Sequence, residues 1–283
     1  MEQLRNLLTT SEFCAISLWN DYVENLDWIW AMMCALHCEN SEHLSEVFRY
    51  VGHSVAERSG IVFDLPVSKE FPFGTLVCEW HGRFGICGAF DSEIADFCQK
   101  MRSDACALMH HASVNPFWGI IGVPRAGWMR VIPELRDKSG ESVAQHSFKT
   151  ACYAGCLCPD AFVDAFLMGL VHDQAEAVVG DLTPAEVDDH REKLRLECDA
   201  YQKMLENVDL PGKVSEWLWH SFEACMTGET NAAHCLHLAD KIDMALQAWT
   251  YERRFHVDLQ EFWDSAGEVI FNSEFGIRNS ELL

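Results

Sequence analysis

The feature that most constrains the fold is a repeat of apolar residues at three- and four-residue steps, which runs through almost all of the second half of the chain. Six segments carry this pattern: 142–157, 160–178, 184–207, 212–227, 230–254 and 258–269. The breaks between them fall at residues that end helices: Pro159, Gly180 to Pro184, Pro211-Gly212 and Gly228. The pattern therefore predicts an all-helical domain in this half.

The first half of the chain is predicted to be mostly helical, with one exception. Residues 11–38, 41–60 and 91–112 show the same helical spacing. Between them, 61–90 is interrupted by glycines and prolines and has alternating β-forming residues, so we expect a small β lobe there, either a hairpin or an irregular lobe.

The segment "SVNPFWGIIGVPRAGW" (113–128) combines prolines and glycines with apolar residues and is predicted to be an ordered, packed connection. We therefore expect two domains in a mainly α protein. The first, 1–118, is a mainly helical domain of unknown role with the small β lobe. The second, 119–283, is all-helical.

Composition excludes several classes of protein. The net charge of −23 leaves no basic face for a long nucleic acid, whereas a small phosphorylated ligand stays possible. No apolar stretch is long enough to cross a membrane, and the 13 cysteines form no C-x-x-C pair, so we expect a soluble cytoplasmic protein with reduced thiols. Cys78, His81 and Cys87 allow a zinc site, but their spacing lacks the close pairs of a structural one.

The segment "LVHDQAEAVVGDLTP" (170–184) carries ionisable residues in an apolar helical pattern. His172 and Glu176 are four residues apart and would share a helix face, with Asp173 about 100° away. His146 and Asp240 lie in other apolar helical segments, where a lone ionisable group is costly to bury. Each alone is more often a surface or core residue, but together they offer two nitrogens and two carboxylates to a divalent metal, which suits Mn, Co, Zn, Fe or Ni, with Mg possible.

The order His, His-Asp, Asp resembles the HD-domain phosphohydrolases. The resemblance is closest to the HD-domain 5'-deoxynucleotidase family and extends over consecutive blocks between about 121 and 253. The blocks are "VPRAGWMR" (123–130), "ESVAQHS" (141–147), "HDQAEAVVGDLTP" (172–184), "HREKLRLE" (190–197) and "LADKIDMALQAWTYE" (238–252).

This resemblance implies a role for each matched residue. Glu176 would orient or deprotonate the attacking water, or protonate the leaving oxygen, and Asp181 would assist that proton transfer or hold the sugar. Arg125 would contact the phosphate, and Trp128 would line the nucleoside side. Gln145 departs from the family, where an acidic residue is more usual, and this affects the tuning of the metal. The metal ligands would be His146, His172, Asp173 and Asp240.

Lys149, one turn beyond His146, and Lys241, beside Asp240, are further candidates for phosphate contacts. For each of them a solvated surface position is an equal alternative.

The reaction implied by the resemblance is metal-dependent hydrolysis of a nucleotide, with deoxynucleoside 5'-monophosphates as the expected substrates. One alternative is a nucleoside triphosphate hydrolase that releases triphosphate or removes phosphates stepwise. Another is a nucleotide-sensing module with a vestigial site, although the complete ligand set argues against it. The expected partners are a small nucleotide and other copies of the chain in a homo-oligomer, with neither a membrane nor a long nucleic acid.

Overall fold

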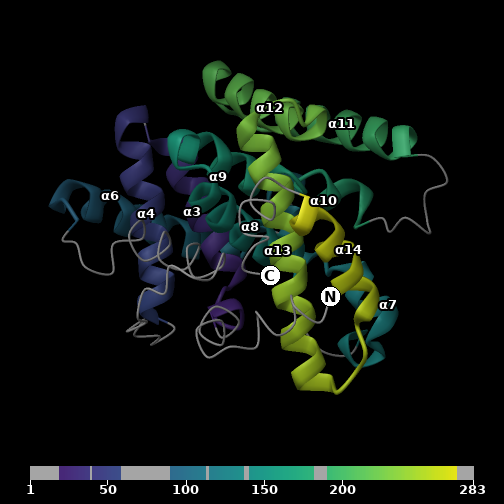
Figure 1. Cartoon of the computed structure of the whole chain (residues 1–283). Helices are drawn as coiled ribbons and strands as arrows, with labels where there is room; N and C mark the ends of the chain where they lie inside the picture. Colours follow the sequence, from purple (N-terminus) through teal and green to yellow (C-terminus); the bar gives the residue numbers. More distant parts are fainter. Residues whose placement is uncertain are drawn as a thin grey trace.

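The computed structural model describes residues 19–38, 40–58, 90–112, 115–136, 140–181 and 190–272 (Figure 1). The described part of the first half contains α3 (Asn25–His37), α4 (Ser41–Arg58) and α6 (Ser92–Met109). Short 3-10 helices (η) and α-helices follow: η2 (Pro116–Gly122), α7 (Ala126–Val131), η3 (Pro133–Arg136), α8 (Val143–Leu157), η4 (Pro159–Ala161), α9 (Phe162–Val171) and α10 (Glu176–Val179). The last part contains α11 (His190–Glu206), α12 (Gly212–Thr227), α13 (Asn231–Phe255) and α14 (Gln260–Asn272).

The predicted mainly α class is confirmed, because the only β pairing among the described residues is one isolated bridge, Pro124 with Ser142. The predicted β lobe at 61–90 lies outside the described residues except for its last position. The zinc candidates Cys78, His81 and Cys87 lie outside them too, as does the first part of the helix predicted at 11–38.

Most helix ends follow from local sequence. α8 begins with a capping box, in which Ser142 accepts the Gln145 backbone N–H and the Gln145 side chain accepts the Ser142 backbone N–H. It ends just before Pro159, which cannot continue a helix. α12 ends at Gly228, whose φ of 66° is in the left-handed region that glycine adopts without strain.

The prediction of one helix over 160–178 is wrong, because the helix is interrupted. α9 ends at Val171, residues 172–175 form turns, and α10 restarts at Glu176. The His172 and Glu176 side chains are therefore not held on one continuous helix face. Part of the physical reason is that the His172 ring bonds back to the Gly169 carbonyl, and that the buried Gln174 side chain donates to the Phe117 carbonyl of η2.

The centre of the fold is the close pair of α8 and α9, crossed by the long helix α13 (Figure 1). The two helices approach each other most closely at Gly169, where an added Cβ would lie 2.3 Å from the Ala151 Cα. Only a glycine fits such a contact between helix backbones. Because α8 carries His146 and α9 leads into His172, this contact fixes the spacing of two predicted metal ligands.

Two helices of the first half, α3 and α4, pack directly against this pair, and α6 packs against α3 and α4 (Figure 1). The buried Trp28 indole in α3 donates to the Leu170 carbonyl at 2.8 Å, and Phe48 of α4 stacks on Phe166 of α9 with ring centroids 4.3 Å apart. The hydrophobic core is continuous across the predicted boundary at 118/119, which falls inside η2. The division into two domains stays a prediction.

Among the described helices, no single one has the length and apolar character of a membrane span. α8 and the segment Pro159–Val179 have them only when taken together, and the two are bent by 115° at the break between them.

Candidate metal centre and catalytic site

The four predicted metal ligands come together from three parts of the fold. His146 projects from α8, His172 and Asp173 from the turn after α9, and Asp240 from α13. The His146 Nε2 atom lies 3.3 Å from Asp240 Oδ1 and 3.4 Å from Asp173 Oδ2, and the His172 Nε2 atom lies 3.2 Å from the same Asp173 oxygen. Two nitrogens and two carboxylates thus face one small volume.

The two imidazoles are held so that one nitrogen of each is left for a ligand. His146 pairs through Nδ1 with Asp243 at 2.7 Å, and His172 donates through Nδ1 to the Gly169 carbonyl at 2.8 Å. Both Nε2 atoms are buried and make no hydrogen bond. Leaving a buried polar atom unsatisfied is costly, and metal-binding histidines in general use one nitrogen for the metal and the other for a carboxylate or carbonyl. This donor set fits a divalent metal.

The electrostatics keep the carboxylate ligands ionised. Burial raises the pKa of Asp173, but the neighbouring His172 and His146 outweigh this and hold it below its usual value. The pKa of Asp240 is likewise held low, against the effect of burial, by Lys241 and His146. Two ionised carboxylates that cost much to bury are what a divalent cation would neutralise.

Glu176 lies at the start of α10, and its carboxyl group behaves in the opposite way. Its side chain is buried and its Oε2 atom has no hydrogen-bond partner. Burial, together with the nearby charges of Asp173 and Asp181, raises the pKa of Glu176 well above its usual value. A carboxyl group with a raised pKa can both release and accept a proton near neutral pH.

Arg125 lies between two carboxylates. Its guanidinium is 3.5 Å from Asp173 and 3.8 Å from Asp181. Burial alone would lower its pKa, but Asp181 and Asp173 raise it, so the group carries a permanent positive charge. Backbone pairing holds it there, since the Arg125 N–H donates to the Glu141 carbonyl at 3.1 Å.

Asp181 is directed to the same place by its own short loop. Gly180, with a φ of 79°, ends α10 and turns the chain. The Asp181 carboxylate then accepts the Ala126 N–H at the start of α7 at 2.6 Å and faces Arg125. Asp181 therefore fixes both the entry of α7 and the position of Arg125.

Two other predicted substrate contacts are engaged inside the protein. Trp128 is buried, stacks on Phe262 with ring centroids 4.1 Å apart, and donates its indole N–H to Glu141 at 3.1 Å. Lys149 is 1% exposed and bonds Gln247 at 2.9 Å, with Glu141 as a further partner. Arg125, Glu176 and Asp181 lie with the metal ligands, whereas Trp128 and Lys149 belong to the packed layer behind them.

Asp243 and Glu141 also contact this layer, and neither is among the residues predicted from the sequence. Asp243 is fully buried and pairs with both His146 and Lys149. A signal for it exists, because Asp240, Asp243 and Gln247 form a polar stripe at three- and four-residue steps along an otherwise apolar helix. Glu141 has no comparable signal in the sequence, since it precedes α8 in an irregular segment.

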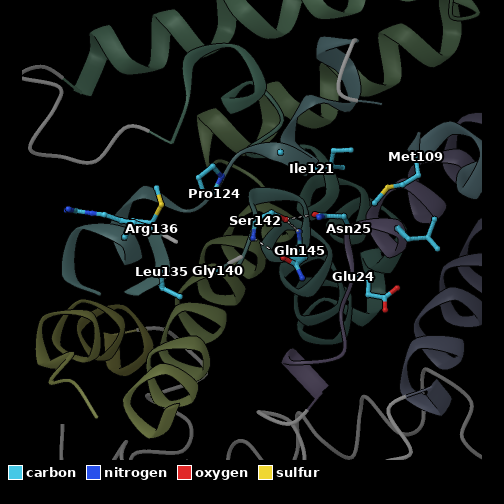
Figure 2. Close-up of a pocket in the computed structure, with 13 residues that line it drawn as sticks. Glu24, Asn25, Met109, Ile121, Pro124, Leu135, Arg136, Gly140, Ser142 and Gln145 are labelled. Carbon is cyan, nitrogen blue, oxygen red and sulfur yellow. Dashed lines mark hydrogen bonds between the residues drawn. The ribbon is translucent and has the colours of Figure 1, made fainter. Parts of the chain in front are cut away.

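Gln145, the departure from the family pattern, connects the two halves of the chain. Besides its capping role, its Nε2 donates to the Val23 carbonyl at 2.7 Å. The adjacent Ser142 hydroxyl donates to Asn25 at 2.5 Å. Figure 2 shows both side chains at the wall of a cavity of about 560 Å³ between the start of α3 and the start of α8. No predicted metal ligand is among the described residues that line this cavity.

Comparison with known proteins gives matches over the part of the chain that carries this site. A family model described as HD domain matches residues 122–274. The 5'-deoxynucleotidase HDDC2 of Dictyostelium discoideum is 33% identical over 159 residues, which cover 50% of this chain and 79% of that protein. The 5'-deoxynucleotidase hdd1 of Schizosaccharomyces pombe is 31% identical over 56% of this chain and 82% of its own length. The human 5'-deoxynucleotidase HDDC2 is 32% identical over 56% and 78%.

Proposed function

This chain belongs to the HD domain family, and from that premise we propose that it hydrolyses deoxynucleoside 5'-monophosphates to nucleoside and inorganic phosphate with the help of a divalent metal. The substrate class is that named for its relatives, each of which matches this chain over more than two thirds of the relative's length.

One observation carries the proposal. The buried Nε2 atoms of His146 and His172 have no hydrogen-bond partner and face the ionised carboxylates of Asp173 and Asp240, with the Arg125 guanidinium 3.5 Å from Asp173. A metal and a fixed cation both assist the hydrolysis of a phosphate monoester, because they offset the negative charge that repels nucleophiles. The arrangement supports both of these roles.

His146, His172, Asp173 and Asp240 would hold the metal. Its mixed nitrogen and oxygen ligands suit Mn, Co, Zn, Fe or Ni better than Ca, with Mg possible. When bound, such a metal acts as a Lewis acid and lowers the pKa of water toward neutrality.

The remaining residues would divide the work of the reaction. Arg125 would grip the phosphate oxygens through its planar fork of N–H groups. A water oxygen forms a bond to phosphorus, the bond from phosphorus to the 5' oxygen breaks, and the leaving oxygen takes up a proton. Glu176, with its raised pKa, would accept the proton of the water or donate the one that the leaving oxygen needs. Asp181 would keep Arg125 and the start of α7 in place.

A product assay tests the proposal. Purified protein is incubated with Mn²⁺ or Co²⁺ and a panel of deoxynucleoside and ribonucleoside mono- and triphosphates, and the products are separated by chromatography. We expect inorganic phosphate and nucleoside from deoxynucleoside monophosphates. Release of triphosphate, stepwise loss of phosphate from triphosphates, or tight nucleotide binding without turnover would each contradict the proposal. His172→Ala serves as the metal-free control.

A further inference from the structure

Lys149 is the centre of a buried group of polar side chains behind the metal ligands. Its ammonium bonds Gln247 Oε1 at 2.9 Å, lies 3.1 Å from Asp243 Oδ1, and makes a close ion pair with Glu141 Oε1. Only the Gln247 contact has hydrogen-bond geometry, and the two carboxylate oxygens face the ammonium as ion pairs. Because the Lys149 side chain is buried among these oxygens, its charge is directed at them and not at a phosphate group entering from solvent.

The ammonium group also occupies a cluster that could otherwise attract a cation. Donor atoms of Glu141, His146 and Asp243 lie within 4.8 Å of one another, and all three residues are buried. Lys149 contacts both carboxylates of this cluster. A lysine ammonium is a compact point charge, so it can take the place of a small cation there.

Asp243 transmits the position of Lys149 to the metal site. One of its oxygens faces Lys149 at 3.1 Å, and the other pairs with His146 Nδ1 at 2.7 Å. This second contact sets the orientation of the His146 ring and directs Nε2 toward Asp173 and Asp240. A partner on the far nitrogen of a metal-binding histidine fixes its tautomer and ring angle.

The other end of the group reaches the substrate side. Glu141 pairs with Lys149 through Oε1 and accepts the Trp128 indole N–H through Oε2 at 3.1 Å. Trp128 belongs to α7, whose first residue follows Arg125. Lys149 thus connects the helix beside the phosphate-binding arginine with the helix that carries His146.

We infer that Lys149 is a positioning residue for the metal site, which holds His146 in its ligand orientation through Asp243 and fills the buried cluster with a fixed positive charge. This inference rests on the metal centre of the proposed function. It replaces the expectation that Lys149 contacts the phosphate of the substrate.

The test is metal affinity, measured by calorimetry with Mn²⁺ alone. Lys149→Met keeps most of the aliphatic stem and removes the charge, and we expect it to weaken Mn²⁺ binding about 10- to 100-fold. At saturating Mn²⁺, the KM for a deoxynucleoside monophosphate should stay within about twofold of the parent. The visible spectrum of the Co²⁺-loaded variant should shift, because the ligand field of His146 changes. Lys100→Met, at an exposed lysine of α6, is the matched control and should change none of these values.

Two more variants keep the inference testable if Lys149→Met does not fold, which circular dichroism and thermal melting would reveal. Gln247→Met removes the one hydrogen bond that a neutral amide oxygen accepts from Lys149 and should give a smaller loss of Mn²⁺ affinity in a folded protein. Asp243→Asn should weaken Mn²⁺ binding about as much as Lys149→Met. If both variants fold and retain the parent's Mn²⁺ affinity, the inference is wrong.

The outcome separates this inference from the proposed function. A raised KM for nucleotide, with weaker binding of inorganic phosphate but unchanged Mn²⁺ affinity, would mean that Lys149 contacts phosphate and would overturn the inference alone. If the parent protein binds Mn²⁺ and Lys149→Met weakens that binding, but the parent hydrolyses no nucleotide, the proposed function is wrong and the inference about Lys149 stands.

Discussion

At the scale of single residues, Glu176 combines a buried side chain with an oxygen that has no hydrogen-bond partner. Burial and the negative charges of Asp173 and Asp181 raise its pKa, and the positive charge of Arg125 partly offsets this rise. Such a carboxyl group is suited to proton transfer rather than to a fixed ion pair. The residue contributes nothing to the four-donor set, so its effects on rate and on metal binding should be separable.

Glu176→Gln should therefore retain the metal and lose activity. We expect kcat to fall about 100- to 10,000-fold, which is the usual contribution of a positioned acid or base. Steady-state kinetics together with metal analysis of the purified variant measure both quantities. Glu261→Gln, at an exposed glutamate of α14 that pairs with Arg130, is the control. Near-parent turnover by Glu176→Gln would remove Glu176 from the proton transfer.

The residues of the site differ in how far sequence alone could predict them. His146, the His172-Asp173 pair and Asp240 are ionisable residues in apolar helical segments, where a lone charge is costly to bury, and their order resembles that of the HD-domain phosphohydrolases. The role of Lys149 could not be predicted in this way. A lysine one turn from a ligand can face either the pocket or the layer behind it, and only the fold shows that it pairs with Glu141 and Asp243.

At the scale of helices, sequence predicts ends that are set by local chemistry. Pro159 and Gly228 end helices because of their own backbone properties, and the structure has both ends where the sequence puts them. No proline or glycine stands at the interruption after Val171 to explain it. It depends on contacts from elsewhere in the fold, such as the Gln174 amide on the Phe117 carbonyl, and was therefore not predictable from the segment itself.

The close contact of α8 with α9 leads to a prediction about stability. Gly169→Ala would place a methyl group 2.3 Å from the Ala151 Cα, so the two helices must separate. We expect the free energy of unfolding to fall by about 1–3 kcal/mol, as for other overpacked cores, measured by urea denaturation. Mn²⁺ affinity should fall as well, because His146 and His172 lie on the two displaced segments.

Gly212→Ala provides the matched control for that prediction. Gly212 is the first residue of α12, and an added Cβ would meet nothing within 4 Å. Alanine also favours helix over glycine by up to about 1 kcal/mol. This variant should be at least as stable as the parent. Equal stability of the Gly169→Ala variant would show that α8 and α9 can separate at no cost.

At the scale of the whole molecule, a net charge of −23 and a centre with several carboxylates make metal binding a source of stability. A ligand that binds only the folded state stabilises it by about 2.7 kcal/mol at one hundred times its Kd. For a chain of this size each kcal/mol raises Tm by about 2–4 °C, so saturating Mn²⁺ should raise Tm by roughly 5–10 °C.

Differential scanning fluorimetry with Mn²⁺, and with EDTA as the reference, measures this shift. Asp173→Ala should abolish most of it, because that carboxylate faces both imidazoles. A similar shift in the parent and in Asp173→Ala would mean that the cation binds elsewhere on the acidic surface.

The helices of the first half illustrate the limit of prediction at this scale. Their helical pattern can be read from the sequence, but their docking depends on shape. Trp28 fits against the Leu170 carbonyl and Phe48 against Phe166, and no local pattern specifies such pairings over more than a hundred residues. The homo-oligomer expected from the family likewise stays a prediction.

The backbone contact at Gly169 also affects the rate at which the site takes up a metal ion. Because the α8 and α9 backbones touch there, His146 and His172 lose their relative freedom when the chain folds, not when the ion arrives. The entropy cost of ordering these two ligands is therefore part of folding and is not added when the metal binds. The rate of metal uptake should then depend on how fast the ion sheds its water, with fast-exchanging Mn²⁺ entering sooner than slow-exchanging Ni²⁺.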